Sequence, residues 1–117
     1  MGAKTFEELR AWQYAAQLSD RIVAFCAHTP ALRSGRFRDQ LVDSAESAPR
    51  LIAEGFGRWS HREFARYLTM AQSEILEVRS DLLALQRRQS INPGAAAELL
   101  DLAEQVAKTI AKLRSSL

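Results

Sequence analysis

The chain has 117 residues, of which 47% are hydrophobic and 26% are charged, a composition typical of a soluble globular protein with one domain, residues 1–117. The formal net charge of +2 is too small to indicate nucleic-acid binding by itself. A single cysteine, Cys26, excludes an internal disulfide, and the longest apolar run, residues 22–27, is too short to span a membrane. Residues 1–30 show no signal peptide, so we expect a cytoplasmic protein that does not use a membrane.

The first predicted helix begins at a capping box, residues 5–8, in which Thr5 accepts a hydrogen bond from the Glu8 amide. This helix should run to about His28 and end before Pro30, because the residue before a proline disfavours helical backbone angles. A short loop rich in serine and glycine then leads to the next helix.

The second predicted helix extends from about Arg36 to Gly55. Gly55 and Gly57 are plausible stop signals, because glycine adopts a positive φ at little cost. Pro49 interrupts the pattern, since a proline inside a helix removes a hydrogen bond and clashes with the preceding turn. The sequence therefore leaves two possibilities, a kinked helix or a pair of helices.

The third predicted helix begins at a second capping box, residues 60–63, and reaches about Gln89. Asn92 then provides an N-cap for the fourth helix, with Pro93 at its first position. Both helices carry apolar residues at alternating spacings of four and three, which is a heptad pattern. The third helix has Phe64, Leu68, Ala71, Ile75, Val78, Leu82 and Leu85; the fourth has Leu99, Ala103, Val106, Ile110, Leu113 and Leu117. Short connections between such helices predict an all-α, antiparallel up-down-up-down four-helix bundle.

Helices one and three carry more apolar surface than one packing stripe requires. The apolar arc of the first helix covers roughly 200°, whereas a stripe that packs on one side needs about 100°. The excess indicates either a wide bundle core or a second apolar face that binds another copy of the chain. The candidates for this self-association interface are Leu18, Ile22 and Phe25 on the first helix, and Leu76 and Leu83 on the third.

The excess of positive charge lies entirely within residues 33–66. Near the start of the third helix it forms a candidate nucleic-acid site of four residues, beside Phe56 and Trp59, whose rings could stack on unpaired bases. These four residues are Arg58, His61, Arg62 and Arg66. The alternative is a solvated arginine face in which Arg58 pairs with Glu54 and Trp59 packs at the helix junction.

No residue pattern indicates catalysis, a cofactor or a metal. The two histidines do not occur in the Glu-x-x-His spacing of di-iron bundles, and Cys26 lies in an apolar helix without a catalytic partner. Glu74 and Glu77 can share a face but lack a nucleophile and a third group, so a solvated or ion-paired face is the better interpretation. We therefore expect a protein that is not an enzyme.

The segment from Gln40 to Arg58, with the core Ile-Ala-Glu-Gly-Phe-Gly-Arg at residues 52–58, resembles the signature of the four helix bundle protein family. That family includes proteins encoded in intervening sequences of bacterial large-subunit rRNA genes. The similarity continues through Ser60, Glu63-Phe64, Leu68 and residues 71–77. Because Phe6, Leu9, Trp12 and Pro30 also stand where the family has them, the resemblance spans nearly the whole chain. One departure is Leu51, which stands where the family usually has asparagine.

The resemblance implies an antiparallel bundle that tolerates a proline inside its second helix and assembles into a ring-shaped homopentamer. A related branch, the accessory variability determinant of diversity-generating retroelements, is a basic pentamer that binds nucleic acid and works with a reverse transcriptase. Two functions follow as hypotheses. The first is a non-enzymatic homo-oligomer, expected to be pentameric, that binds RNA or DNA electrostatically; the second is a scaffold that recruits a partner protein and binds no nucleic acid.

Overall fold

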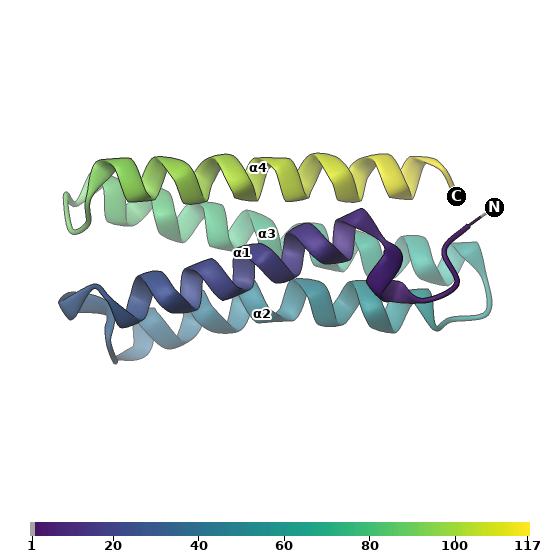
Figure 1. The fold of residues 1–117 in the computed structure, drawn as a ribbon, viewed down its shortest axis with the longest axis horizontal. Coiled ribbons are helices and arrows are strands. Elements are labelled where there is room, and N and C mark those ends of the chain that lie inside the picture. The colour runs from purple at the N-terminus through teal and green to yellow at the C-terminus, as the bar shows by residue number, and fades with distance from the viewer. Residues whose placement is uncertain (1) are drawn as a thin grey trace.

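The computed structural model describes residues 2–117, which form four long helices around one apolar core (Figure 1). Each helix runs antiparallel to the next, and the bundle measures 44 × 21 × 19 Å. Helices α1 and α3 each pack against both α2 and α4, so the helices occupy the corners of a square. The long helices are α1 (Arg10–Ala27), α2 (Arg36–Phe56), α3 (His61–Arg87) and α4 (Pro93–Ser115), with short 3-10 turns at Phe6–Glu8 and Pro30–Leu32. The predicted all-α, up-down-up-down four-helix bundle is confirmed.

Two of the predicted helix starts have the expected caps. The Ser60 hydroxyl accepts a hydrogen bond from the Glu63 amide at 3.1 Å at the start of α3. The Asn92 side chain accepts from the amides of Gly94 and Ala95 at 2.8 and 3.2 Å at the start of α4. These bonds satisfy backbone donors that have no partner within the first turn of a helix.

The predicted start of the first helix is wrong. The Thr5 hydroxyl donates to the Glu8 carboxylate at 3.4 Å and does not accept from the Glu8 amide, and α1 begins only at Arg10. The Phe6 ring packs edge to face against Trp12, with ring centroids 5.3 Å apart. This contact accompanies a single 3-10 turn, and the chain changes direction before α1 begins.

Helix α2 is one continuous helix that contains Pro49, as the family resemblance implies. Gly57 is the C-cap at which α2 ends, as expected, but its φ is −78° and not positive. Gly55 is not a stop signal, because α2 continues through it. Gly55 is instead buried against α3, where a Cβ at this position would lie 2.5 Å from the Cβ of Tyr67. Glycine is therefore required here for the close approach of two helices.

The core contains the heptad pattern that the sequence predicts for α3. All seven of its predicted residues are buried, and so are the first four of the pattern in α4. Leu113 and Leu117, at the end of the α4 pattern, are partly buried. None of the helices within residues 2–117 combines the length and apolarity that a bilayer crossing requires.

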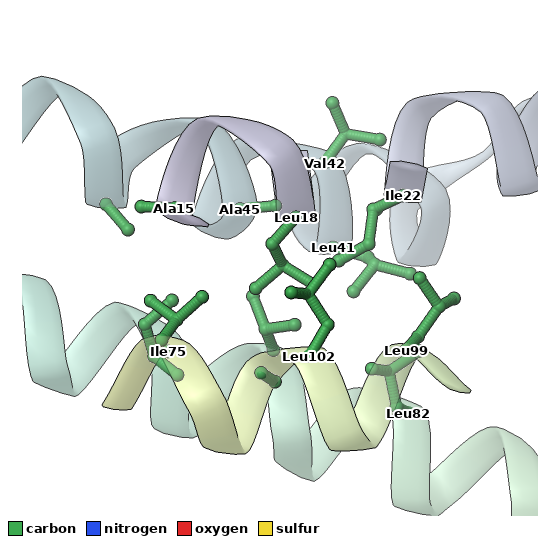
Figure 2. Close-up of a cluster of buried hydrophobic side chains, with 14 of the residues drawn as sticks. Ala15, Leu18, Ile22, Leu41, Val42, Ala45, Ile75, Leu82, Leu99 and Leu102 are labelled. Atoms are coloured by element: carbon green, nitrogen blue, oxygen red, sulfur yellow. The ribbon is translucent and has the colours of Figure 1, made fainter. Parts of the chain in front are cut away.

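Two of the five candidate interface residues are assigned to the wrong surface. Leu18 and Ile22 are fully buried in the monomer, in the same cluster as Leu41 of α2 and Leu102 of α4 (Figure 2). The reason is that α1 contacts two neighbouring helices, so an apolar arc much wider than a single stripe is buried without a second copy. Phe25 is partly buried and also packs against the core.

The other two interface candidates are exposed. Leu76 retains 58% and Leu83 retains 47% of its accessible surface. Because the two residues are seven apart on α3, they lie on the same side of the helix, beside the buried heptad positions. Among the described residues, the only other large apolar side chain that is this exposed is Trp59.

Candidate nucleic-acid interface

The candidate residues gather at the turn between α2 and α3, at the end of the bundle that also holds both termini (Figure 1). Arg58 lies in the turn, His61 and Arg62 belong to the first turn of α3, and Arg66 follows one helical turn later. All four side chains belong to exposed residues. We call this end of the molecule the α2–α3 end.

Tyr67 brings two of the arginines together. The Arg58 guanidinium donates a hydrogen bond to the Tyr67 hydroxyl and lies 4.7 Å from the centre of its ring. The Arg66 guanidinium lies 5.3 Å from the same ring and forms an exposed ion pair with Glu63 at 3.2 Å. Stacking of guanidinium on an aromatic ring limits the motion of a long side chain. The close packing of Tyr67 on Gly55 therefore helps to fix the position of two positive charges.

A cleft of about 530 Å³ lies beside Arg58 at the α2–α3 end. Its rim carries Trp59, whose side chain is 103% exposed, and its apolar wall includes Phe56 and Phe64, whose rings meet edge to face at 6.0 Å. The remaining lining comes from the N-terminal segment, the turn and the end of α4: Gly2, Ala3, Leu9, Arg58, Ser60, His61, Leu113, Ser116 and Leu117.

The alternative arrangement that the sequence allowed is wrong at two points. Arg58 contacts Tyr67 and forms no ion pair with Glu54, and Trp59 extends into solvent without packing at the helix junction. The ion pair between Arg66 and Glu63 agrees with a solvated outer face.

The four candidate residues divide between two surfaces. Arg58 and His61 line the cleft, whereas Arg62 and Arg66 do not. On a helix, His61 and Arg66 are separated by about 140°, and Arg62 and Arg66 by only about 40°. Within residues 2–117, Arg62 takes part in no ion pair.

The basic excess of residues 33–66 does not form a single surface. Helix α2 has 21 residues, and at about 1.5 Å per residue its ends are roughly 30 Å apart. Arg36 and Arg38 lie in the first turn of α2, and Arg33 just before it, so all three are at the end of the bundle opposite Arg58.

The sequence profile of the 23S rRNA-intervening sequence protein family matches residues 7–112. The chain belongs to this family. Its fold is similar to the crystal structure of a protein of unknown function from the S23 ribosomal protein family of Bacteroides thetaiotaomicron VPI-5482. The TM-score is 0.80 at 19% identity over 89% of this chain and 97% of that one, a likeness that establishes the fold alone. No curated protein sequence matches the chain.

In this member of the 23S rRNA-intervening sequence family, polar contacts that the sequence reasoning missed join α2 to α3. Ser44 donates to Glu77 at 3.1 Å, and the Gln40 amide lies 3.4 and 3.5 Å from the two carboxylate oxygens of Asp81. Each helix contributes a pair of residues four apart, and this spacing is the signal that could have revealed the contacts.

Partial burial, and then the charges of Glu77 and Asp43, raise the pKa of Glu74.

The remaining reactive groups are isolated from one another. Burial raises the pKa of the Cys26 thiol, and the charge of Arg38 offsets this only in part, so the thiol remains protonated at neutral pH. His28 bonds to the Ala24 carbonyl at 2.8 Å at the end of α1. No group of three or more potential metal ligands occurs among residues 2–117.

Proposed function

We propose that this member of the 23S rRNA-intervening sequence family is a non-enzymatic, cytoplasmic homo-oligomer that binds RNA or DNA through Arg58, His61, Arg62 and Arg66. The observation that carries the proposal is the complete exposure of Trp59 at the rim of a cleft that Arg58 and His61 also line. A fully exposed tryptophan beside cationic side chains combines the two elements of sequence-tolerant recognition of single strands: a stacking surface and an electrostatic surface.

Arg62 and Arg66 extend the electrostatic surface outside the cleft. Their separation of four residues puts them on one side of α3, and Arg62 has no ion-pair partner within the described residues. A backbone that passes from the cleft along this side of α3 would meet both guanidinium groups. Binding of this kind depends on phosphate charge, so its affinity should fall steeply as salt increases.

The test of nucleic-acid binding is the double variant Arg62→Glu, Arg66→Glu, measured by filter binding across a series of salt concentrations. We expect the affinity of the variant for a single-stranded oligonucleotide to fall by about tenfold or more at low salt, while its native mass stays unchanged. Exchange of Lys108, an exposed cation on α4, for glutamate is the matched control and should leave binding nearly unchanged. Undetectable binding of the wild-type protein at low salt would contradict the proposal.

The proposed self-association surface contains Leu76 and Leu83. On α4, Leu100 and Ala107 are also seven residues apart and partly buried, and the Ala107 carbonyl accepts from Gln72 of α3 at 3.0 Å. The helical positions of these residues therefore form an apolar strip along the outer α3–α4 surface. Such a strip suits contact with a second copy. The family resemblance favours a ring of five subunits. In such a ring the small net positive charge of each subunit adds up around the symmetry axis.

The test of self-association is Leu76→Glu, with Leu82→Glu as the buried control. The exposed substitution should dissociate the oligomer and leave the helix content and thermal stability of the subunit nearly unchanged. The buried substitution should unfold the subunit, because a charge would enter the core. Light scattering gives the mass, and a wild-type mass of 13.1 kDa at micromolar concentration would contradict the oligomer.

A protein-recruiting scaffold without nucleic-acid binding is the second candidate function. The exposed Leu76 and Leu83 favour it, because apolar side chains of this size also suit a different protein partner. If this function is correct, the double arginine variant behaves like the wild type in filter binding, and Leu76→Glu abolishes capture of the partner.

A further inference from the structure

The end of the bundle opposite the α2–α3 end contains a second basic surface, which we call the α1–α2/α3–α4 end. The antiparallel topology brings the connection from α1 to α2 and the connection from α3 to α4 to this same end (Figure 1). Five arginines lie in or beside these two connections, although one group is far from the other in the sequence. They are Arg33, Arg36 and Arg38 from the first connection and Arg87 and Arg88 from the second.

A direct contact joins the two groups. The Arg88 guanidinium lies 5.8 Å from the centre of the Phe37 ring in the first turn of α2. Arg88 is the C-cap of α3, and the turn that follows is closed by a hydrogen bond from the Ser90 amide to the Leu85 carbonyl at 3.0 Å. The second connection is therefore packed onto the start of α2 and does not extend away from it.

Three acidic residues toward this end already have polar partners, and one of them, Glu98, lies 3.7 Å from Arg21. Arg38 pairs with Asp39 at 3.0 Å, and Asp81 is hydrogen bonded to Gln40. The other four arginines form no ion pair within residues 2–117. All four are exposed residues, and the Arg88 guanidinium also contacts the Phe37 ring.

The surface offers charge without a stacking surface. Phe37 is the aromatic residue that Arg88 covers, and it is partly buried against the core. Within the described residues, no large apolar side chain at this end is as exposed as Trp59 at the other. Recognition here would therefore involve phosphates and not unpaired bases.

We propose that Arg33, Arg36, Arg87 and Arg88 bind the phosphate backbone of a nucleic-acid duplex. A duplex has one negative charge per about 1.7 Å of its axis, and neutralising these charges with several arginines releases condensed counterions. Arginine suits this role because its planar guanidinium can donate two parallel hydrogen bonds to one phosphate. This site differs from the single-strand site proposed at the α2–α3 end, and the two can be tested separately.

The test compares the variant Arg33→Gln, Arg36→Gln, Arg87→Gln, Arg88→Gln with Arg62→Glu, Arg66→Glu. The probes are a blunt-ended DNA duplex and one of its strands alone, each labelled with a fluorophore. The quadruple variant should bind the duplex at least about tenfold more weakly than the wild type. The slope of its log affinity against log salt concentration should become shallower by about 0.9 for each phosphate that is no longer neutralised. The variant at the α2–α3 end should keep its duplex affinity and lose the single strand.

A milder variant, Arg33→Gln with Arg36→Gln, leaves the contact between Arg88 and Phe37 in place. It should lose a smaller part of the duplex affinity, at unchanged thermal stability. The proposal would be overturned if the quadruple variant kept the wild-type duplex affinity, or if the wild-type protein bound no duplex. If the quadruple variant lost affinity for the single strand and for the duplex equally, the assignment of this site to a duplex would be overturned. The single-strand measurements on the α2–α3 variant test the proposed function independently of these results.

Discussion

The two ends of this 44 Å bundle are both basic, but they combine positive charge with different surroundings. At the α2–α3 end, Arg58 and Arg66 contact the Tyr67 ring, and a fully exposed Trp59 borders a cleft. At the α1–α2/α3–α4 end, the arginines come from two connections and no comparable aromatic side chain is exposed within the described residues. The number of arginines therefore does not define a ligand. The neighbouring aromatic surface decides whether bases or only phosphates can be recognised.

Among the variants that test the difference between the two ends, Gly55→Ala should have the largest effect. The new Cβ would lie 2.5 Å from the Tyr67 Cβ and 3.0 Å from Phe64 Cδ1, so α2 and α3 must separate. We expect a loss of about 2–3 kcal/mol in the free energy of unfolding, which chemical denaturation would measure. Single-strand binding should weaken as well, because Tyr67 would no longer hold its arginines.

Gly57→Ala is the matched control for Gly55→Ala. The nearest atom to its new Cβ would be the Glu54 carbonyl oxygen at 3.5 Å, an ordinary contact, and the φ of −78° suits alanine. This variant should be as stable as the wild type or more stable by about 0.5 kcal/mol. Equal destabilisation by both substitutions would show that the approach of Tyr67 is not the cause.

Trp59→Ala should have the next largest effect, and only on one ligand. A stacked base contributes about 1–3 kcal/mol, so single-strand affinity should fall by roughly 5-fold to 150-fold while duplex affinity stays unchanged. Thermal stability should not change, because the Trp59 side chain is fully exposed. Trp59→Phe should restore most of the affinity in the same fluorescence anisotropy assay. A duplex affinity that falls in parallel would remove the distinction between the two ends.

Glu74→Gln should have the smallest effect and should not change the binding affinity of either end. Because burial and neighbouring carboxylates raise the pKa of Glu74 in the folded state, its charged form destabilises the protein at neutral pH. The substitution should therefore raise the free energy of unfolding at pH 7 by less than about 1 kcal/mol. This gain should disappear as the pH falls through the raised pKa, where the wild-type carboxyl becomes protonated and uncharged. Both binding affinities serve as controls.

Local sequence was sufficient for the helices and for part of the core. The Ser60 and Asn92 caps depend on groups two or three residues away, and the α3 heptad residues are buried because their spacing matches the turn of a helix. The exposed charges of Arg58, Arg62 and Arg66 follow from the same reasoning. Thr5 shows the limit, because a contact between Phe6 and Trp12 accompanies a 3-10 turn in place of the expected helix start.

The sequence by itself determined the number, order and approximate ends of the helices, because hydrogen bonding and apolar periodicity within one helix act over a few residues. Only the tertiary structure decided which apolar side of α1 is internal, since Leu18 and Ile22 are buried by helices that lie far from them in the chain. It also decided that Arg88 meets Phe37 and that Arg58 meets Tyr67. The contact between Arg88 and Phe37 depends on antiparallel packing, which brings two distant connections to one end of the bundle. The contact between Arg58 and Tyr67 spans only nine residues and depends on how the α2–α3 turn folds back on α3.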